Sequence, residues 1–166
     1  MSMLQTKLRL RFYGDPVLRR RSEPLDQVTD KEREILAEMA ELMRISGGIG
    51  LAAPQVGINK QIVLVDIGQG PVVLINPRIT RKTGWASMEE GCLSLPGVYV
   101  KVKRAKMIQV SGLNEENQKV RITAYDLLAR ALAHEIDHLR GRLILDYAGF
   151  LQKIKLRKKL NSILQT

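Results

Sequence analysis

The sequence predicts an α+β fold in which antiparallel β-strands pack around a central helix, with an amphipathic helix near the N-terminus and another helix at the C-terminus. Two observations support this prediction. Apolar residues recur at helical spacing within 29–46 and 123–141. Short apolar runs lie between them, too close together for the long crossovers that parallel strands require. Because 45% of the 166 residues are hydrophobic, we expect one domain over 1–166.

The N-terminal helix, expected at 29–46, places apolar residues on one side. They are Ile35, Leu36, Met39, Leu42 and Met43. Gly47 and Gly48 follow as a stop signal. Strands are then expected at 61–66, 72–76, 98–103, 107–111, 119–122 and 143–147, and a terminal helix from residue 149 onward.

The central helix is expected at 123–141, because Thr123 and Asp126 are typical of a capped start and Gly141 of a stop. Its apolar stripe is expected to be buried and consists of Leu127, Leu128, Ala131, Leu132 and Leu139. On a helical wheel Arg130, Asp137 and Arg140 point away from this stripe, as solvated charges do.

The end of this helix reads H-E-x-x-H over residues 134–138, and the chain has only two histidines. His134 and His138 lie one helical turn apart on the same face, where both can bind one metal ion, and Glu135 can act as a base. Such a match also arises by chance. Glu135 falls within the apolar stripe, however, where a carboxylate is costly unless it is paired or near a metal. The pattern therefore favours a metal site.

A catalytic metal site of this kind takes a third protein ligand and keeps one position open. A carboxylate is one candidate for that ligand. Cys92, the only cysteine, is a better one, although a lone cysteine is often an inert buried thiol. Glycine and proline residues flank Cys92, which predicts a bend between strands that presents its side chain and free backbone N–H groups.

The segment 47–57 is rich in glycine, and Gln55 closes an otherwise apolar run within it. A phosphate-binding role is weakly supported, because the Gly-Lys-Ser/Thr of a P-loop is missing. The Gln55 amide is placed to donate a hydrogen bond into a cleft, or it is an ordinary loop residue.

Three segments, taken together, resemble the motifs of the peptide deformylase family. They are 48–55 (GIGLAAPQ), 90–94 (EGCLS) and 134–138 (HEIDH), in the family's order and spacing. The stretch 15–19 (DPVLR) is similar to the family's start, so the resemblance covers nearly the whole chain. It implies a metal-dependent hydrolase that removes the N-formyl group from formyl-methionyl nascent peptides and releases formate.

The resemblance also implies a role for each site residue. Cys92, His134 and His138 would bind the metal, and Glu135 would take a proton from the attacking water and pass it to the leaving amine. The Gln55 side chain and the Leu93 backbone N–H would stabilise the oxyanion. Gly50 would offer backbone contacts to the substrate. Glu90 and Asp137 are candidates to orient the ligating histidines, although the wheel turns Asp137 toward solvent.

An apolar pocket would select the methionine side chain. Its candidate lining residues are Ile49, Met88, Leu127 and Ala131, for which ordinary core packing is the alternative. Three positions depart from the pattern expected of the family, namely Ala133, Tyr99 and Arg130, and these bear on how the substrate is held.

One divalent metal ion is expected. A cysteine and two histidines suit several transition metals. The resemblance implies Fe²⁺ as the working metal, with Zn²⁺, Ni²⁺ or Co²⁺ as substitutes. A single cysteine and the lack of a signal peptide or membrane span predict a cytoplasmic protein without membrane contact, and a processed organellar protein would look the same.

The net charge of +10 indicates attraction to polyanions, or only general solubility. In the C-terminal helix one apolar stripe is expected, formed by Leu156, Leu160, Ile163 and Leu164. Lys155, Lys158 and Lys159 lie opposite, and the helix resembles the extension by which some deformylases contact ribosomal RNA.

Two other interpretations of the whole chain are a zincin-type protease and an RNA-binding protein with a structural metal. A zincin usually takes its third ligand downstream of H-E-x-x-H, whereas Cys92 lies upstream, which counts against the protease. A structural metal site needs no buried base, so Glu135 counts against the RNA-binding protein.

Overall fold

The computed structural model describes residues 6–165, so residues 1–5 and 166 of the expected domain lie outside the described part. Its five-stranded sheet is antiparallel throughout, in the order β1-β2-β3-β4-β5, and the α+β prediction is confirmed. The strands are β1 Gly50–Ala52, β2 Ile62–Val65, β3 Val72–Cys92, β4 Leu95–Leu113 and β5 Lys119–Tyr125. The helices are α1 Asp30–Ile45, α2 Asp126–His138 and α3 Phe150–Leu164, with short 3₁₀ helices η1 Pro16–Arg19, η2 Ala53–Val56 and η3 Ile144–Tyr147.

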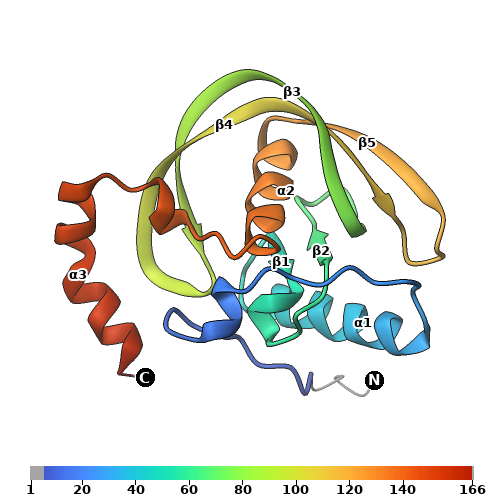
Figure 1. Ribbon diagram of the computed structural model, residues 1–166, viewed down its shortest axis with the longest axis horizontal. Coiled ribbons are helices and arrows are strands. Elements are labelled where there is room, and N and C mark those ends of the chain that lie inside the picture. The colour runs from blue at the N-terminus through green and yellow to red at the C-terminus, as the bar shows by residue number, and fades with distance from the viewer. Residues whose placement is uncertain (1–5, 166) are drawn as a thin grey trace.

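Strands β3 and β4 form one long hairpin that arches over α2 (Figure 1). The strand expected at 72–76 is the start of β3, and the strands expected at 98–103 and 107–111 are parts of β4. The rest of β3, residues 77–92, was not predicted from the sequence. Register shifts between Ile75 and Arg78, between Ile79 and Arg81, and between Glu90 and Cys92 interrupt the ladder. Such bulges bend and twist a strand. The curvature lets the hairpin reach around the helix, and it breaks the alternation that would have predicted a continuous strand.

Helix α2 begins at Asp126, three residues later than expected, so the predicted capped start at Thr123 is wrong. Thr123 belongs to β5 and pairs with Gln109 of β4. Because this pairing satisfies the backbone groups of Thr123, the residue stays in the strand and does not start the helix. The strand expected at 143–147 is also wrong. That segment forms η3, in which the Asp146 carboxylate accepts the backbone N–H of Leu143 at 3.0 Å.

The strands β1 and β2 separate α2 from α1, and their side chains alternate between the two helices. Ala52, Val63 and Val65 pack in the cluster of α2, with Leu132 and Ile136. Leu51, Ile62 and Leu64 pack in the cluster of α1, with Met39 and Leu42. Consequently α2 is held between the β1–β2 pair and the β3–β4 arch, which makes it the most enclosed helix of the fold.

Two expectations about apolar stripes need correction. Leu127 was expected on the buried stripe of α2 but is 47% exposed in the first turn of the helix. In α3 the residues Leu156, Leu160 and Ile163 pack against the cluster of Leu18, Val98 and Val100, whereas Leu164 at the last turn is 55% exposed. Among residues 6–165, no helix has both the length and the apolar character needed to cross a membrane.

Candidate active site

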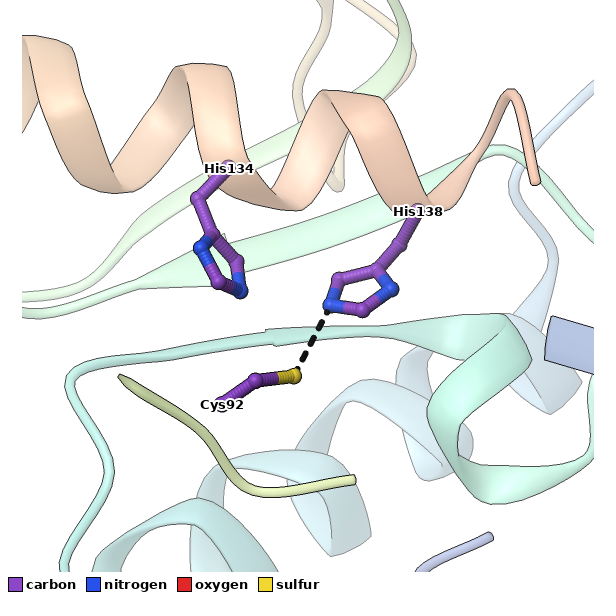
Figure 2. A group of neighbouring side chains, drawn as sticks. All are labelled: Cys92, His134 and His138. Atoms are coloured by element: carbon purple, nitrogen blue, oxygen red, sulfur yellow. Dashed lines mark hydrogen bonds between the residues drawn. The ribbon is translucent and has the colours of Figure 1, made fainter. Parts of the chain in front are cut away.

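Helix α2 carries both histidines toward the same side. The rings of His134 and His138 stand 5.1 Å apart between centroids, at 66° to each other, as expected for residues one turn apart on a helix. Figure 2 shows both rings directed toward Cys92. Burial lowers the pKa of His138 well below its usual value, which keeps this imidazole neutral, the form that binds a metal.

Cys92 is the last residue of β3, and Leu93 and Ser94 form the turn into β4, which agrees with the predicted bend. Its Sγ lies 3.3 Å from His138 Nε2. One ligand atom from each of Cys92, His134 and His138 lies within 4.8 Å of the other two. A thiolate and two imidazoles are a known open ligand set for a transition metal, so the residues present fit a single divalent ion. The hydrogen bonds of His134 with Cys92 and Glu90 outweigh burial and raise its pKa, and metal binding would displace the proton involved.

Glu135 lies between the histidines and is only 4% exposed. Its Oε2 has no hydrogen-bond partner among residues 6–165. Burial in this setting raises the pKa of Glu135 to about 7. A carboxyl group that titrates near neutral pH can both accept and return a proton, which is what a general base and acid requires.

Gln55 lies in η2 on the other side of Cys92 and is fully buried. Its Oε1 accepts the backbone N–H of Ala52 at 2.8 Å, which fixes the amide so that the NH₂ group faces the site. Its Nε2 lies 3.5 Å from Cys92 Sγ and 3.3 Å from Ser94 Oγ. Sequence reasoning gave no role to Ser94, although its place two residues after Cys92 was a usable signal.

A buried ion network supports the histidine side of the site. Glu90 accepts hydrogen bonds from Arg104 at 2.6 and 3.0 Å and from Arg130 at 2.7 Å, and contacts His134 Nδ1 at 3.0 Å. Burial alone would raise the pKa of Glu90, but the hydrogen bonds from His134 and Arg104 prevail and bring it to about 2. Glu90 therefore stays ionised and orients the His134 ring, as expected of a residue behind a metal ligand.

The predicted solvation of Arg130 and Asp137 is wrong. Arg130 is 7% exposed and bonds to Glu90, while Asp137 accepts from Arg104 at 2.8 Å and from the Tyr147 hydroxyl at 2.6 Å. The wheel identified one buried face of α2, but the β3–β4 arch and η3 cover the other faces. Asp137 was also a candidate partner for His138. Within residues 6–165, His138 Nδ1 is buried without a hydrogen-bond partner.

The site opens into a pocket of about 500 Å³. All five residues expected to contact substrate line it, namely Ile49, Gly50, Met88, Leu127 and Ala131. Cys92, His134, Glu135, Gln55 and Leu93 line the same pocket, so the expected substrate and catalytic residues come together. Of the three departures noted in the sequence, Tyr99 and Arg130 also line the pocket.

Comparisons with known proteins agree with this geometry. The family model described as polypeptide deformylase matches residues 7–154. A peptide deformylase from Halothermothrix orenii is 50% identical over 141 residues, covering 84% of this chain and 92% of that protein. One from Nitrosococcus oceani is 43% identical over 155 residues, covering 92% and 93%.

Solved structures show the same likeness in three dimensions. A peptide deformylase from Synechococcus elongatus, crystallised with actinonin, has a TM-score of 0.86 and 40% identity and covers 99% of this chain and 88% of that chain. One from Legionella pneumophila has a TM-score of 0.90 at 33% identity and covers 95% of both chains. The site geometry, the family match and these relatives lead to one conclusion: the chain belongs to the polypeptide deformylase family, metal-dependent hydrolases that remove N-formyl groups.

Proposed function

We propose that this enzyme hydrolyses the N-formyl group of formyl-methionyl nascent peptides and releases formate, with the metal held by Cys92, His134 and His138. The observation that carries the proposal is the meeting of this ligand set with Glu135, a buried carboxylate whose Oε2 has no protein partner within residues 6–165, in one open pocket. A structural metal site has no use for such a carboxylate, since leaving it unpaired is costly.

A divalent cation at these residues would supply Lewis acidity that activates water for attack on a carbonyl carbon. Glu135 takes a proton from the attacking water and transfers it to the leaving amine. Its pKa of about 7 suits both halves of this cycle at neutral pH. For this role the Glu135 carboxylate needs no hydrogen-bond partner from the protein, because the attacking water and the substrate would lie next to it in the pocket.

The oxyanion that forms on the formyl group requires hydrogen-bond donors fixed in advance. Gln55 Nε2 is suited to this role because the Ala52 N–H holds the other end of the amide. The Leu93 backbone N–H, in the turn after Cys92, is the second donor. Ser94 lies beside Gln55 Nε2, so its hydroxyl helps to hold that amide in place.

For the substrate, we propose that Ile49, Met88, Leu127 and Ala131 receive the methionine side chain and that Gly50 contributes backbone contacts. Ile49, Met88 and Leu127 are roughly half exposed, although they are large and apolar. Together at the edge of one pocket, they form a surface that an unbranched apolar side chain can cover.

Fe²⁺ is our proposed working metal, with Zn²⁺, Ni²⁺ or Co²⁺ able to replace it, since a mixed sulfur and nitrogen ligand set accepts all four. We also propose that residues 1–166 form one metallohydrolase domain that acts in the cytoplasm. A reducing compartment would keep Cys92 available as a thiolate ligand.

Contact with ribosomal RNA through α3 is a further part of the proposal. The helix has lysines at 153, 155, 158 and 159 and an arginine at 157. Lys159 donates to the Gly97 carbonyl at 2.9 Å, so Lys155 and Lys158 are the better probes. Lys155→Glu with Lys158→Glu should weaken cosedimentation with ribosomes, whereas the same reversal at exposed Lys31 and Lys82 should not. Equal cosedimentation of both double variants would contradict this contact.

The test of the reaction is formate release from formyl-Met-Ala-Ser by protein purified without air and loaded with Fe²⁺ or Ni²⁺. Wild type should release formate, and Glu135→Gln, which keeps the shape of the side chain, should not while its metal content is unchanged. No release by folded, metal-loaded wild type would contradict the proposed reaction. Release by Glu135→Gln at the wild-type rate would contradict the role of Glu135.

A further inference from the structure

Gly50 lies at the first position of β1, directly against the Glu135 side chain. A Cβ atom at this position would stand 2.4 Å from Glu135 Oε1, 2.9 Å from its Cδ and 3.0 Å from its Cγ. The φ angle of Gly50 lies outside the left-handed region, so its backbone conformation is open to any residue. Glycine is therefore required here for space and not for backbone geometry.

Little in the protein holds the end of the Glu135 side chain by hydrogen bonding, since its buried Oε2 has no partner within residues 6–165. Packing must then define where the carboxylate lies. The neighbouring surface is the backbone of β1, which is itself fixed, because Gly50 pairs with Val65 of β2 and the Ala52 N–H donates to Gln55. Glu135 thus rests against a rigid strand that also orients Gln55.

We propose that Gly50 is a positioning residue that acts through Glu135, in addition to any backbone contact with the substrate. Its missing side chain lets the carboxylate pack against β1 and so fixes where the proton is accepted. The inference rests on the proposed role of Glu135 as base. With a methyl group at position 50, the carboxylate must retreat by about 1 Å to reach ordinary contact at 3.4 Å. A misplacement of this size can lower a rate by about 10²-fold.

The kinetic test is Gly50→Ala on Ni²⁺-loaded enzyme with formyl-Met-Ala-Ser. We expect kcat to fall by about 10²-fold, with KM changed by less than about threefold and the metal content unchanged. Gly149→Ala is the matched control, because Gly149 has an ordinary φ and a Cβ atom added there would have nothing within 4 Å, so this variant should keep wild-type kinetics. A raised KM with unchanged kcat would overturn the proposal, since it would mean that the methyl group obstructs the substrate.

Glu135→Asp supplies a rescue experiment, because the shorter side chain withdraws its carboxylate from β1. Glu135→Asp alone should be slow. Adding Gly50→Ala to it should cost less than about threefold in kcat, against about 10²-fold in the wild-type background. Equal cost in both backgrounds would show that Gly50 acts independently of Glu135 and would overturn the inference.

A thermal-unfolding cycle tests the contact without relying on activity. Gly50→Ala should lower Tm by about 3–10 °C in wild type, the shift that overpacking by one methyl group produces in a protein of this size. In the Glu135→Ala background it should leave Tm unchanged or raise it by about 1–4 °C, because the space is then vacant and alanine lowers the entropy of the unfolded chain. If Gly50→Ala alone does not fold, folding of the double variant would itself support the contact, and failure of both to fold would contradict it. Coupling in Tm without deformylation by wild type would reject the proposed function, and with it the positioning role, while the contact itself would stand.

Discussion

Replacement of Arg130 by methionine should destabilise the protein far more than a surface arginine does. The guanidinium donates to Glu90 at 2.7 Å and to the backbone carbonyls of Val102 and Ala86 at 3.0 and 2.8 Å. It therefore ties α2 to both strands of the arch. Hydrogen bonds that involve a charged group contribute about 1.5–3 kcal/mol each, and breaking a buried ion pair costs about 3–5 kcal/mol. Glu90 keeps Arg104 as a partner, so we expect about 3 kcal/mol.

Urea unfolding of the metal-loaded variant, fitted by linear extrapolation, measures this loss. Arg44→Met is the control, because Arg44 is 70% exposed and, within the described residues 6–165, pairs only with Glu41 on the surface of α1, where such pairs contribute about 0–1 kcal/mol. A second measurement is the d–d absorption spectrum of the Co²⁺-loaded protein, which should shift in Arg130→Met if Glu90 no longer holds His134 in place. A loss below about 1 kcal/mol, equal to that of the control, would refute the reasoning.

Three further predictions concern the rest of the site and its support. Gln55→Ala should lower kcat by about 10²–10³-fold with unchanged metal content, as measured by initial rates and metal analysis. Leu127→Asp should raise KM for formyl-methionyl peptides more than it lowers kcat, because residue 127 lies at the pocket edge and not at the reacting atoms. A fall in kcat with unchanged KM would contradict this prediction. Burial opposes ionisation of Asp146, but the hydrogen bond from Arg19 prevails and lowers the pKa of this carboxyl group in the folded state. The pair therefore stabilises the fold at pH values above the unfolded-state pKa. This stability is lost as the pH falls through the lower folded-state pKa. The Tm of Asp146→Asn should consequently fall less than that of wild type between pH 6 and pH 3, and parallel curves would contradict the assignment.

Local patterns predicted the parts of the structure that depend on neighbours in sequence. The spacing of His134 and His138 placed both rings on one face of a helix, and the glycines and proline around Cys92 predicted its turn. The capped start at Thr123 was wrong because pairing with Gln109 satisfies that backbone, and this partner lies on another strand.

Burial of charged residues was the harder problem. A helical wheel describes one apolar stripe, and it assigned Arg130 to solvent. The β3–β4 arch encloses α2 on further sides, and there the charge of Arg130 is balanced by Glu90, which is 40 residues away in the chain. Such a pairing depends on the curvature of a bulged hairpin, which leaves no periodic signal in the sequence.

The three proposed metal ligands differ in how they come together. His134 and His138 are neighbours wherever the helix forms, whereas Cys92 is 46 residues from His138 and meets it only when the long hairpin has closed around α2. The ion therefore binds the folded chain with three ligands and the unfolded chain with fewer. By mass action, each tenfold rise in free metal above the dissociation constant adds up to about 1.4 kcal/mol to the stability of the folded state, and binding to the unfolded chain reduces this gain. A cell short of this metal would thus hold fewer active molecules and also lose more of the protein to unfolding and proteolysis, so metal supply would set the abundance of the enzyme as well as its activity.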